Sequence, residues 1–368
     1  MKILLIGEYS SVHWTLAEGL RHLGHKVTVL SNGDFWKDYP TDICLKRKPT
    51  KLGGMAYMAK LYAMLPRLRG YDVVQLINPM FLELKAERLF PIYSYLRKHN
   101  GRMVLGAFGM DYYWVHVCST EKPLRYSDFN MGTQLRTDED ALKEQADWLG
   151  TEKERLNRLV AEDCDGIVCG LYEYYACYKP YFADKMRFIP YPVKPCEQSC
   201  AEPLEDRKIR LFIGINKNRS VYKGTDIMLD AAEEVVARHK DRVELVKAES
   251  VPFADYMKMM EGSDAILDQL YSYTPAMNAL QAMSKGIVCV GGGEPENYEI
   301  LGERELRPII NVEPTRESVV KALEQFVAHP GRIPAMKQDS VAYIRRHHDY
   351  IKVARQYEDF YLWLGKSR

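Results

Sequence analysis

The chain has 368 residues, a formal net charge of +1 and 27% charged residues. This length exceeds one typical hydrophobic core and predicts two domains, while the balanced charge excludes the basic excess typical of nucleic-acid-binding proteins. No apolar run approaches the roughly 18 to 20 residues that span a bilayer, and the apolar start at residues 1–7 is too short for a signal-peptide core, so we expect a cytoplasmic protein.

Strands and helices alternate through the first half of the chain. Short apolar runs bounded by turn residues predict strands, and longer stretches with helical periodicity predict the helices between them. The expected strands are residues 2–6, 26–30, 72–77, 102–108, 166–169 and 186–189, and the expected helices are residues 12–23, 55–65, 83–98 and 138–162. This order is typical of a doubly wound parallel sheet.

A linker rich in proline follows, and the same alternation returns after it. The expected strands of the second half are residues 209–213, 243–246, 265–267 and 287–290, and the expected helices are residues 226–238, 253–260, 275–285 and 340–364. We therefore predict an α/β fold of two Rossmann-like lobes, residues 1–195 and 205–340, and a terminal helix, residues 341–368. Such lobes bind ligands at the carboxyl ends of their strands, so the cleft between them is the expected site.

The eight cysteines do not form a disulfide framework, because a chain with a large core has little need for covalent staples. Cys164, Cys169 and Cys289 lie in or beside apolar strand segments, and Cys196 and Cys200 lie in the linker without paired histidines. We expect reduced thiols and no metal site.

Residues 271–301 predict a loop, a helix, a short strand and a glycine-rich turn. Met277, Leu280 and Met283 recur at helical spacing, and Gly286 ends that helix. The start of a helix offers backbone N–H groups and a positive dipole end to a phosphate. The glycine-rich turn, at Gly292 and Gly293, lets the backbone approach a ligand closely.

Two motifs in this segment carry a family resemblance. Residues 280–286 read Leu-Gln-Ala-Met-Ser-Lys-Gly and residues 292–296 read Gly-Gly-Glu-Pro-Glu. They resemble the Leu-Glu-Ala-Met…Gly helix and the Gly-Gly-x-Pro-Glu turn of GT-B glycosyltransferases of the family 4-like group. The resemblance spans nearly the whole chain and is sharpest over residues 223–301. It implies a GT-B enzyme that binds a nucleotide sugar mainly through its second lobe.

The resemblance also implies individual roles in the second lobe. The family carries two glutamates eight residues apart, near the donor sugar and the ribose; here these positions are Tyr273 and Gln281. Gln281 is expected to hold the ribose through its amide, and Tyr273 to face the sugar. Whether the chain keeps full activity without both glutamates stays open. Asp268, which ends a predicted strand, is the nearest acid that could replace one of them.

Cations and amides are expected around the donor diphosphate. By the resemblance, Lys223 and Arg219 bind the diphosphate, since departure of a nucleoside diphosphate builds negative charge that fixed cations stabilise in the transition state. The alternative is an exposed cationic loop. Asn278 adds a side-chain donor or merely caps its helix. Glu296 either holds the turn or touches the donor, or it only complements a helix dipole.

The first lobe offers an acceptor-side loop at Gly7, Ser10 and Ser11, with His13 on the helix that follows. This loop lacks the Gly-x-Gly-x-x-Gly pattern, which argues against a nicotinamide-dependent oxidoreductase. His13 points to the cleft or is packed, as a single histidine usually is. Residues 106–111, Gly-Ala-Phe-Gly-Met-Asp, resemble the family's His-Gly-x-Asp turn, so Asp111 is a catalytic candidate; a helix or loop cap is the alternative.

The combined expectation is a glycosyltransferase of the hexosyltransferase type that transfers a sugar from a nucleotide-sugar donor to a glycan or lipid-linked acceptor. By the resemblance it acts with retention, without metal and without a cofactor, in surface polysaccharide or glycoconjugate synthesis. The rivals are a catalytically weakened nucleotide-sugar-binding protein and a GT-B nucleotide-sugar epimerase. The donor, the acceptor and the oligomeric state are not predicted.

A basic cluster at residues 46–51 precedes an apolar helix, residues 55–65. This combination either favours peripheral contact with an anionic membrane surface at the inner face of the membrane, or is an ordinary amphipathic surface helix.

Overall fold

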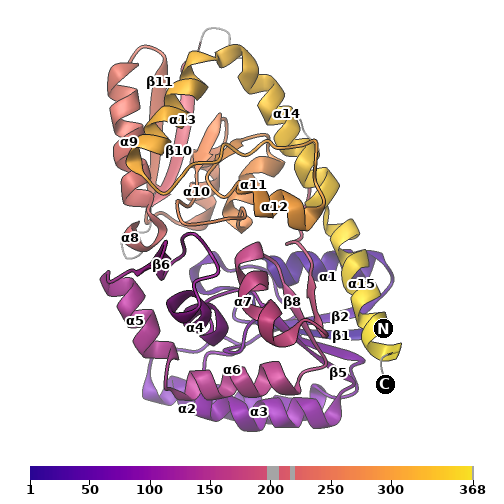
Figure 1. The fold of residues 1–368 in the computed structure, drawn as a ribbon. Helices are drawn as coiled ribbons and strands as arrows, with labels where there is room; N and C mark the ends of the chain where they lie inside the picture. Colours follow the sequence, from indigo (N-terminus) through magenta and orange to yellow (C-terminus); the bar gives the residue numbers. More distant parts are fainter. Residues whose placement is uncertain (197–206, 216–219, 367–368) are drawn as a thin grey trace.

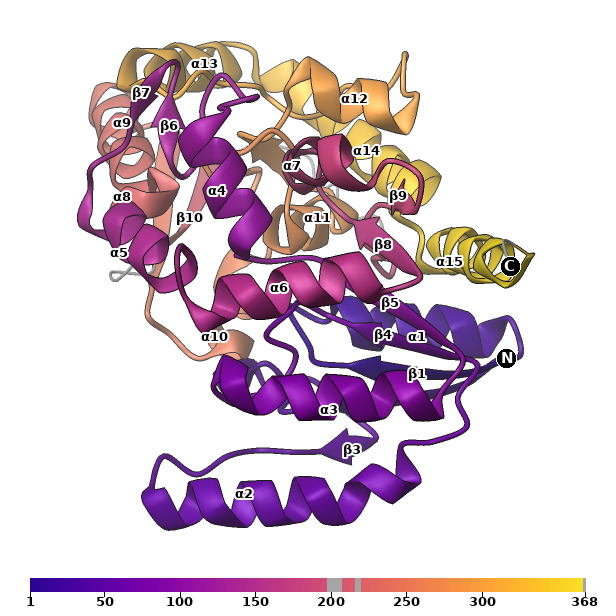
Figure 2. The same ribbon diagram turned by 60° about the horizontal axis from the view of Figure 1, so that its bottom comes forward.

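The computed structural model describes residues 1–196, 207–215 and 220–366, which form two α/β lobes stacked on one another (Figure 1). The first lobe contains a seven-stranded parallel sheet in the order β3-β2-β1-β4-β5-β8-β9. Its strands are β1 (Lys2–Ile6), β2 (Lys26–Ser31), β3 (Ile43–Cys44), β4 (Val73–Leu76), β5 (Arg102–Ala107), β8 (Gly166–Cys169) and β9 (Met186–Phe188). Both faces of this sheet are covered by helices, as its nearly continuous apolar strands require (Figure 2).

Alternation along β1 divides the core of the first lobe in two. Leu4 and Ile6 belong to the cluster that takes in α2 (Lys51–Met64), α3 (Ala86–His99) and α6 (Glu152–Asp163). Ile3 and Leu5 belong to the cluster formed with α1 (Val12–His22) and α15 (Tyr350–Lys366). Successive residues of a strand point to opposite faces, so this division follows directly from the sequence.

The predicted helix of residues 138–162 is in fact two helices, α5 (Glu139–Trp148) and α6. Gly150 between them has a φ of 70°, which a continuous helix does not allow, and the Thr151 hydroxyl caps the second helix by accepting from Lys153 N. Two further helices, α4 (Tyr112–Thr120) and α7 (Tyr172–Phe182), begin at the carboxyl ends of β5 and β8. A small hairpin, β6 (Asn130–Met131) and β7 (Gln134–Leu135), lies between α4 and α5.

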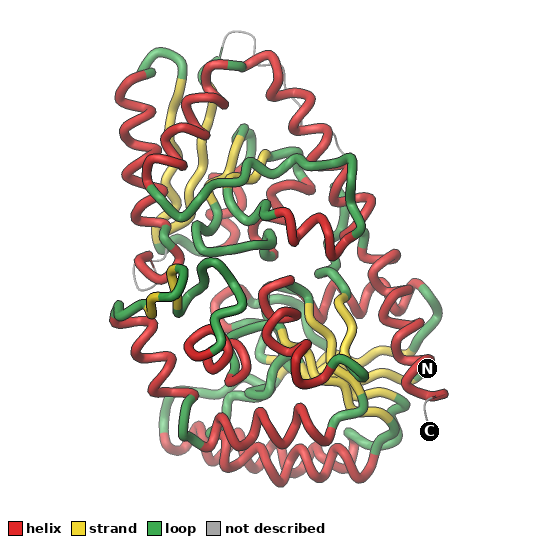
Figure 3. Tube along the Cα trace, viewed as in Figure 1, coloured by secondary structure: helices red, strands yellow, loops and turns green. Residues whose placement is uncertain are grey.

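The second lobe contains a four-stranded parallel sheet in the order β11-β10-β12-β13. Its strands are β10 (Ile209–Ile215), β11 (Val243–Glu249), β12 (Ala265–Leu267) and β13 (Val288–Val290). Its helices are α8 (Ser220–Lys223), α9 (Thr225–Arg238), α10 (Phe253–Met260), α11 (Met277–Ser284), α12 (Pro295–Leu301), α13 (Arg316–Ala328) and α14 (Ile333–Tyr343). The strands of the two lobes form two separate groups with helices around each (Figure 3).

The chain returns to the first lobe at its end. After α14 a π-helical turn, Ile344–His348, leads to Asp349, whose carboxylate caps α15 by accepting from Ile351 N and Lys352 N. The Asp349 segment bridges to Val193, where the first lobe ends, and α15 packs on α1. A Cβ on Gly19 of α1 would lie 2.4 Å from the Tyr350 carbonyl oxygen, so only glycine allows this approach. No helix of the described residues is long and apolar enough to cross a membrane.

Candidate active site

Two loops of the second lobe touch at the carboxyl edge of its sheet. One loop follows β12 and leads to α11, and the other is the turn after β13. Gly291 and Gly292 in that turn have φ angles of 100° and 73°, and a Cβ on Gly291 would lie 2.5 Å from the Gln269 carbonyl oxygen. Glycine is required at both positions, because this backbone conformation and this close approach exclude a side chain.

A polar cluster lies beside this contact. The Asn278 amide donates to Asp268 Oδ1 at 2.8 Å, and the Tyr256 hydroxyl donates to Asn278 Oδ1 at 2.9 Å. Burial raises the pKa of the Asp268 carboxyl, and the positive charge of Lys223 opposes that rise. Lys223 ends α8, and its carbonyl oxygen accepts from Leu270 N at 3.0 Å. The structure thus brings together three predicted donor-site residues, Lys223, Asp268 and Asn278.

Tyr273 lies in a contact between the lobes. Its side chain is buried, and its hydroxyl accepts from Arg125 N of the first lobe at 2.7 Å. The Arg125 guanidinium lies 4.9 Å from the centre of the Tyr273 ring, and the rings of Tyr126 and Tyr172 lie 4.9 and 5.9 Å away. Burial raises the pKa of Tyr273 to about 12. This position therefore supplies a neutral aromatic side chain, and its role toward a donor sugar stays a prediction.

Gln281 also takes part in a contact between the lobes. Its side chain lies near the hydroxyl of Tyr39, which follows β2 in the first lobe; burial raises the pKa of that hydroxyl, and Gln281 opposes the rise. The Tyr39 ring packs edge-on against Phe253 of α10, with ring centres 5.4 Å apart. Gln281 can hold a ribose only if Tyr39 gives way or shares the ligand.

The glycine-rich turn is held from the first lobe by Arg125. One guanidinium nitrogen lies 2.5 Å from Glu296 Oε1 and another donates to Glu294 Oε2 at 2.7 Å. The Tyr126 hydroxyl also donates to Glu294. Arg125 holds the pKa of Glu296 below its ordinary value. Gly293, between these acids and Gly292, is fixed by its N–H, which donates to Asn311 Oδ1 at 3.3 Å.

Glu173 forms a second contact with the second lobe, which sequence analysis missed. It lies in the first turn of α7, and only 5% of its surface is exposed. Its Oε1 accepts from Tyr273 N at 2.6 Å, Thr274 N at 3.1 Å and the Ser272 hydroxyl at 3.2 Å, and its Oε2 accepts from the Thr274 hydroxyl. Burial raises the pKa of this carboxyl. One side chain of the first lobe thus fixes the loop that carries Tyr273.

The acceptor-side loop after β1 is shaped by an internal carboxylate. Gly7, Ser10 and Ser11 have φ angles of 88°, 51° and 67°. The Glu8 side chain accepts from His13 N at 3.2 Å and from Trp14 N at 2.8 Å, so it occupies the anion-binding end of α1. Burial raises the pKa of Glu8 to about 8.

His13 does not reach the cleft, which corrects its assignment to the acceptor side. It is 0% exposed; its Nδ1 lies 2.8 Å from Gly7 O and its Nε2 lies 3.1 Å from Gln75 Nε2. Burial lowers the pKa of His13 to about 3, so the ring is neutral. His13 thus supports the loop after β1 through its contact with Gly7 O.

Asp111 is likewise a structural residue, which corrects its assignment as catalytic. It is 0% exposed, its Oδ1 caps α4 by accepting from Trp114 N at 2.9 Å, and its Oδ2 accepts from the Tyr178 hydroxyl at 2.8 Å. Burial raises the pKa of Asp111 to about 7. The capping alternative is the one that the geometry supports.

Sequence analysis did not predict a hydrogen-bonded group of three polar residues that joins the loop after β2 to the loop after β1. The Lys37 ammonium donates to Ser10 Oγ at 2.8 Å and to Asp34 Oδ2 at 2.6 Å, and Ser10 N donates to the same carboxylate oxygen at 2.8 Å. The group ties the loops after β1 and β2 together at the edge of the sheet where Tyr39 contacts the second lobe. The Asn32-Gly33-Asp34 turn was the sequence signal for it.

Arg219 lies outside the described residues. Among those described, no group of three or more His, Cys, Asp or Glu side chains is arranged to hold a metal ion.

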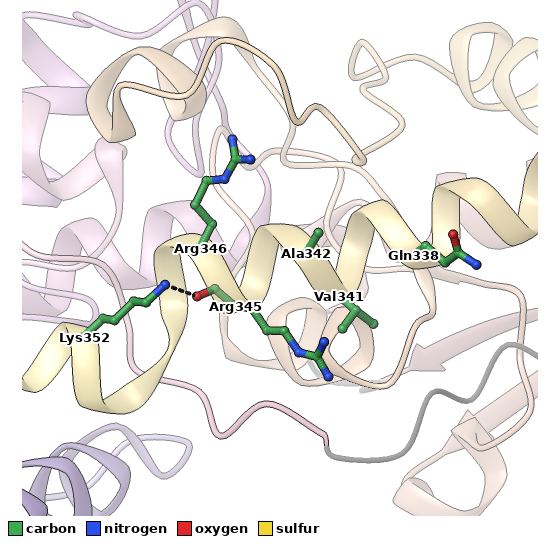
Figure 4. Close-up of a pocket in the computed structure, with 6 residues that line it drawn as sticks. All are labelled: Gln338, Val341, Ala342, Arg345, Arg346 and Lys352. Atoms are coloured by element: carbon green, nitrogen blue, oxygen red, sulfur yellow. Dashed lines mark hydrogen bonds between the residues drawn. The ribbon is translucent and has the colours of Figure 1, made fainter.

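A cationic hollow of about 450 Å³ lies away from these loops, along α14, the π-helical turn and the start of α15 (Figure 4). The Lys352 ammonium there donates to the Arg345 carbonyl oxygen at 2.9 Å, and Arg346 pairs with Glu303 and Glu305.

No model of a known protein family matches the sequence, and no curated protein sequence matches it. Solved structures are similar along the whole chain. Sucrose-phosphate synthase from Thermosynechococcus elongatus has 12% identity, covers 100% of each chain and gives a TM-score of 0.62. HepE from Anabaena, in complex with UDP and glucose, has 12% identity, 98% coverage of each chain and a TM-score of 0.59.

A third similar structure is the UDP-GlcNAc 2-epimerase from Neisseria meningitidis bound to UDP-GlcNAc. It has 12% identity, covers 99% of this chain and 100% of its own, and gives a TM-score of 0.54. Because these likenesses run from end to end across both lobes, they show that the chain has the GT-B glycosyltransferase fold.

Proposed function

We propose that the protein is a glycosyltransferase that takes a sugar from a nucleotide-sugar donor and transfers it to a glycan or lipid-linked acceptor. The observation that carries the proposal is the cluster of Lys223, Asp268 and Asn278 beside the turn at Gly291 and Gly292. It lies at the carboxyl edge of a parallel sheet, where folds of this class bind nucleotides.

Each part of the cluster has a role toward a diphosphate. The Lys223 ammonium balances the charge that develops as the nucleoside diphosphate leaves, and such preorganised charge lowers the barrier selectively. The start of α11 adds the dipole of a helix. The glycines let the turn after β13 pack directly against the loop that leads to α11. We propose that the transfer retains the anomeric configuration, needs no metal and serves surface polysaccharide or glycoconjugate synthesis.

The contacts of Arg125, Glu173 and Tyr39 across the cleft fit a closed state. A donor then needs the lobes to separate, and their return excludes water from the activated sugar. UDP-sugars are the first donors to test, because HepE has been solved with UDP-glucose and with UDP and glucose.

The test is turnover of a panel of UDP- and GDP-sugars, measured as release of the nucleoside diphosphate with and without glycan and lipid-linked acceptors. The proposal requires acceptor-dependent release that Lys223→Ala strongly reduces. Release that is absent with every donor, despite nucleotide binding, contradicts it.

A non-catalytic nucleotide-sugar-binding protein is the second candidate. The observation that favours it is that Tyr273 and Gln281, at the positions of the family glutamates, carry no charge and take part in contacts between the lobes. Binding without turnover identifies this function. An epimerase, the chemistry of one similar structure, is separated from both by incorporation of solvent deuterium into the sugar without an acceptor.

A further inference from the structure

Helix α2 is apolar on two opposite sides. Its inward side chains, which include Tyr57 and Leu61, are buried in the core of the first lobe. Its outward side chains repeat at helical spacing and are all exposed: Leu52, Met55, Ala56, Ala59, Tyr62 and Ala63. Leu52 is 77% exposed, Met55 69% and Tyr62 48%. We call these six residues the α2 outer face.

An ordinary amphipathic surface helix presents polar side chains to water. The α2 outer face does the opposite, so the alternative of an ordinary surface helix does not account for it. Contiguous exposed apolar side chains on a folded lobe mark a surface that binds something. The helix lies at the outer margin of the first lobe, beside the edge strand β3 (Figure 2).

The segment that carries this face has charges of one sign. Between Asp42 and Asp72 the sequence contains no acidic residue. It contains seven basic residues there, all of them exposed, which we call the basic flank: Lys46, Arg47, Lys48, Lys51, Lys60, Arg67 and Arg69. Lys46 pairs with Asp38, and Lys60 donates to the Cys44 carbonyl oxygen. The Arg47 N–H donates to Glu83, so Asp38 and Glu83 lie beside the basic flank, but its seven basic residues outnumber these two acids.

We propose that the α2 outer face docks on an anionic lipid surface. A helix that lies in the membrane interface inserts its apolar side chains at the boundary of headgroups and acyl chains, while Lys and Arg meet the phosphates. A tyrosine such as Tyr62 suits the same boundary. A second copy of the chain is the poorer partner, because joining two outer faces brings two basic flanks together.

The position of α2 indicates the class of acceptor, an inference that rests on the proposed function. Because all strands of the first sheet are parallel, the loop from β3 to α2 leaves the same edge as the loops after β1 and β2. Lys48 and Lys51 therefore lie on the side of the lobe that faces the cleft. Docking places the acceptor side of the cleft next to the bilayer, which fits a lipid-linked acceptor better than a free glycan.

The experiment is co-sedimentation of the full chain, without donor, with phosphatidylcholine vesicles that contain or lack phosphatidylglycerol. We expect binding only with phosphatidylglycerol, weakened by added salt. Met55→Glu is expected to reduce the partition coefficient more than tenfold. Lys48→Glu is expected to reduce it more than fivefold, since each cation near such a surface contributes roughly fivefold. Leu142→Glu, at a 50% exposed leucine of α5, is the matched control and is expected to bind normally.

Equal binding by Met55→Glu and wild type overturns the proposal, and so does binding that ignores phosphatidylglycerol. Sedimentation velocity gives a further test: a dimer of the wild type that Met55→Glu dissolves assigns the face to a second copy and contradicts lipid docking. Because the readout needs no sugar transfer, its failure leaves the glycosyltransferase proposal standing. A protein that binds the vesicles but transfers no sugar contradicts the glycosyltransferase proposal and leaves lipid docking intact.

Discussion

The Glu173 carboxylate is the sharpest test of how the lobes are held together. Glu173→Ala removes the acceptor of two buried backbone N–H groups, those of Tyr273 and Thr274. An unsatisfied buried donor costs about 1–3 kcal/mol, so the closed arrangement loses about 2–6 kcal/mol. The Ser272 hydroxyl keeps a hydrogen-bond partner in this variant, because it also donates to the Thr274 carbonyl oxygen at 2.5 Å.

Glu173→Gln is the matched variant. The amide oxygen keeps the contacts of Oε1, and the Thr274 hydroxyl can turn to accept from the new NH₂ group. Burial already raises the pKa of Glu173, so the folded state disfavours the charge that this substitution removes. We therefore expect Glu173→Gln to destabilise the closed arrangement slightly and Glu173→Ala to destabilise it strongly.

The assay combines urea unfolding with small-angle scattering. We expect the alanine variant to show a lower unfolding midpoint and a larger radius of gyration, because opening the lobes lets water reach the orphaned N–H groups. The glutamine variant is expected to match the wild type in both. The reasoning is refuted if both variants behave alike, or if alanine changes neither quantity.

Three further changes test the site. Lys223→Ala is expected to weaken UDP binding roughly 10- to 150-fold, the equivalent of about 1.5–3 kcal/mol for a charge-assisted contact; calorimetry showing the same Kd as for Lys285→Ala, at the far end of α11, would contradict it. Gln281→Glu is expected to keep or improve donor use, as a ribose contact requires, and loss of turnover would show a different role. Glu8 has its pKa raised from 4.5 to about 8, so the folded state holds a proton that the unfolded state has lost. Stability therefore falls as pH rises through this window, by at most about 5 kcal/mol; Glu8→Gln should flatten that slope in urea unfolding, and an unchanged slope would exclude Glu8 as its source.

Much of the fold could be predicted from the sequence, because its strands are short apolar runs and its helices have clear periodicity. The strand predicted at residues 265–267 and the glycine turn after β13 lie where expected. β3 and the β6–β7 hairpin were missed, since two-residue strands have no periodicity to detect. Gly150 is typical of the end of a helix and Thr151 of the start of the next one. This pair in the sequence would have divided the helix of residues 138–162.

The site could be predicted only in part. Lys223, Asp268 and Asn278 lie close together, as expected from their places after successive strands. The loops at the carboxyl ends of parallel strands all lie at the same edge of the sheet. The contacts of Glu173 and Arg125 join residues 100 and 171 positions apart, and no local pattern reports such pairs. For buried polar residues a single sequence also gives no means to separate a helix cap from a catalytic group.

The central claim is that the second lobe holds a nucleoside diphosphate between Lys223 and the glycine turn. A crystal structure of the protein with UDP tests it most directly. The account predicts that the diphosphate lies within hydrogen-bond distance of the Lys223 ammonium and the backbone of Gly291–Gly292, at the start of α11. UDP bound elsewhere, with Lys223 directed away from it, would contradict the account.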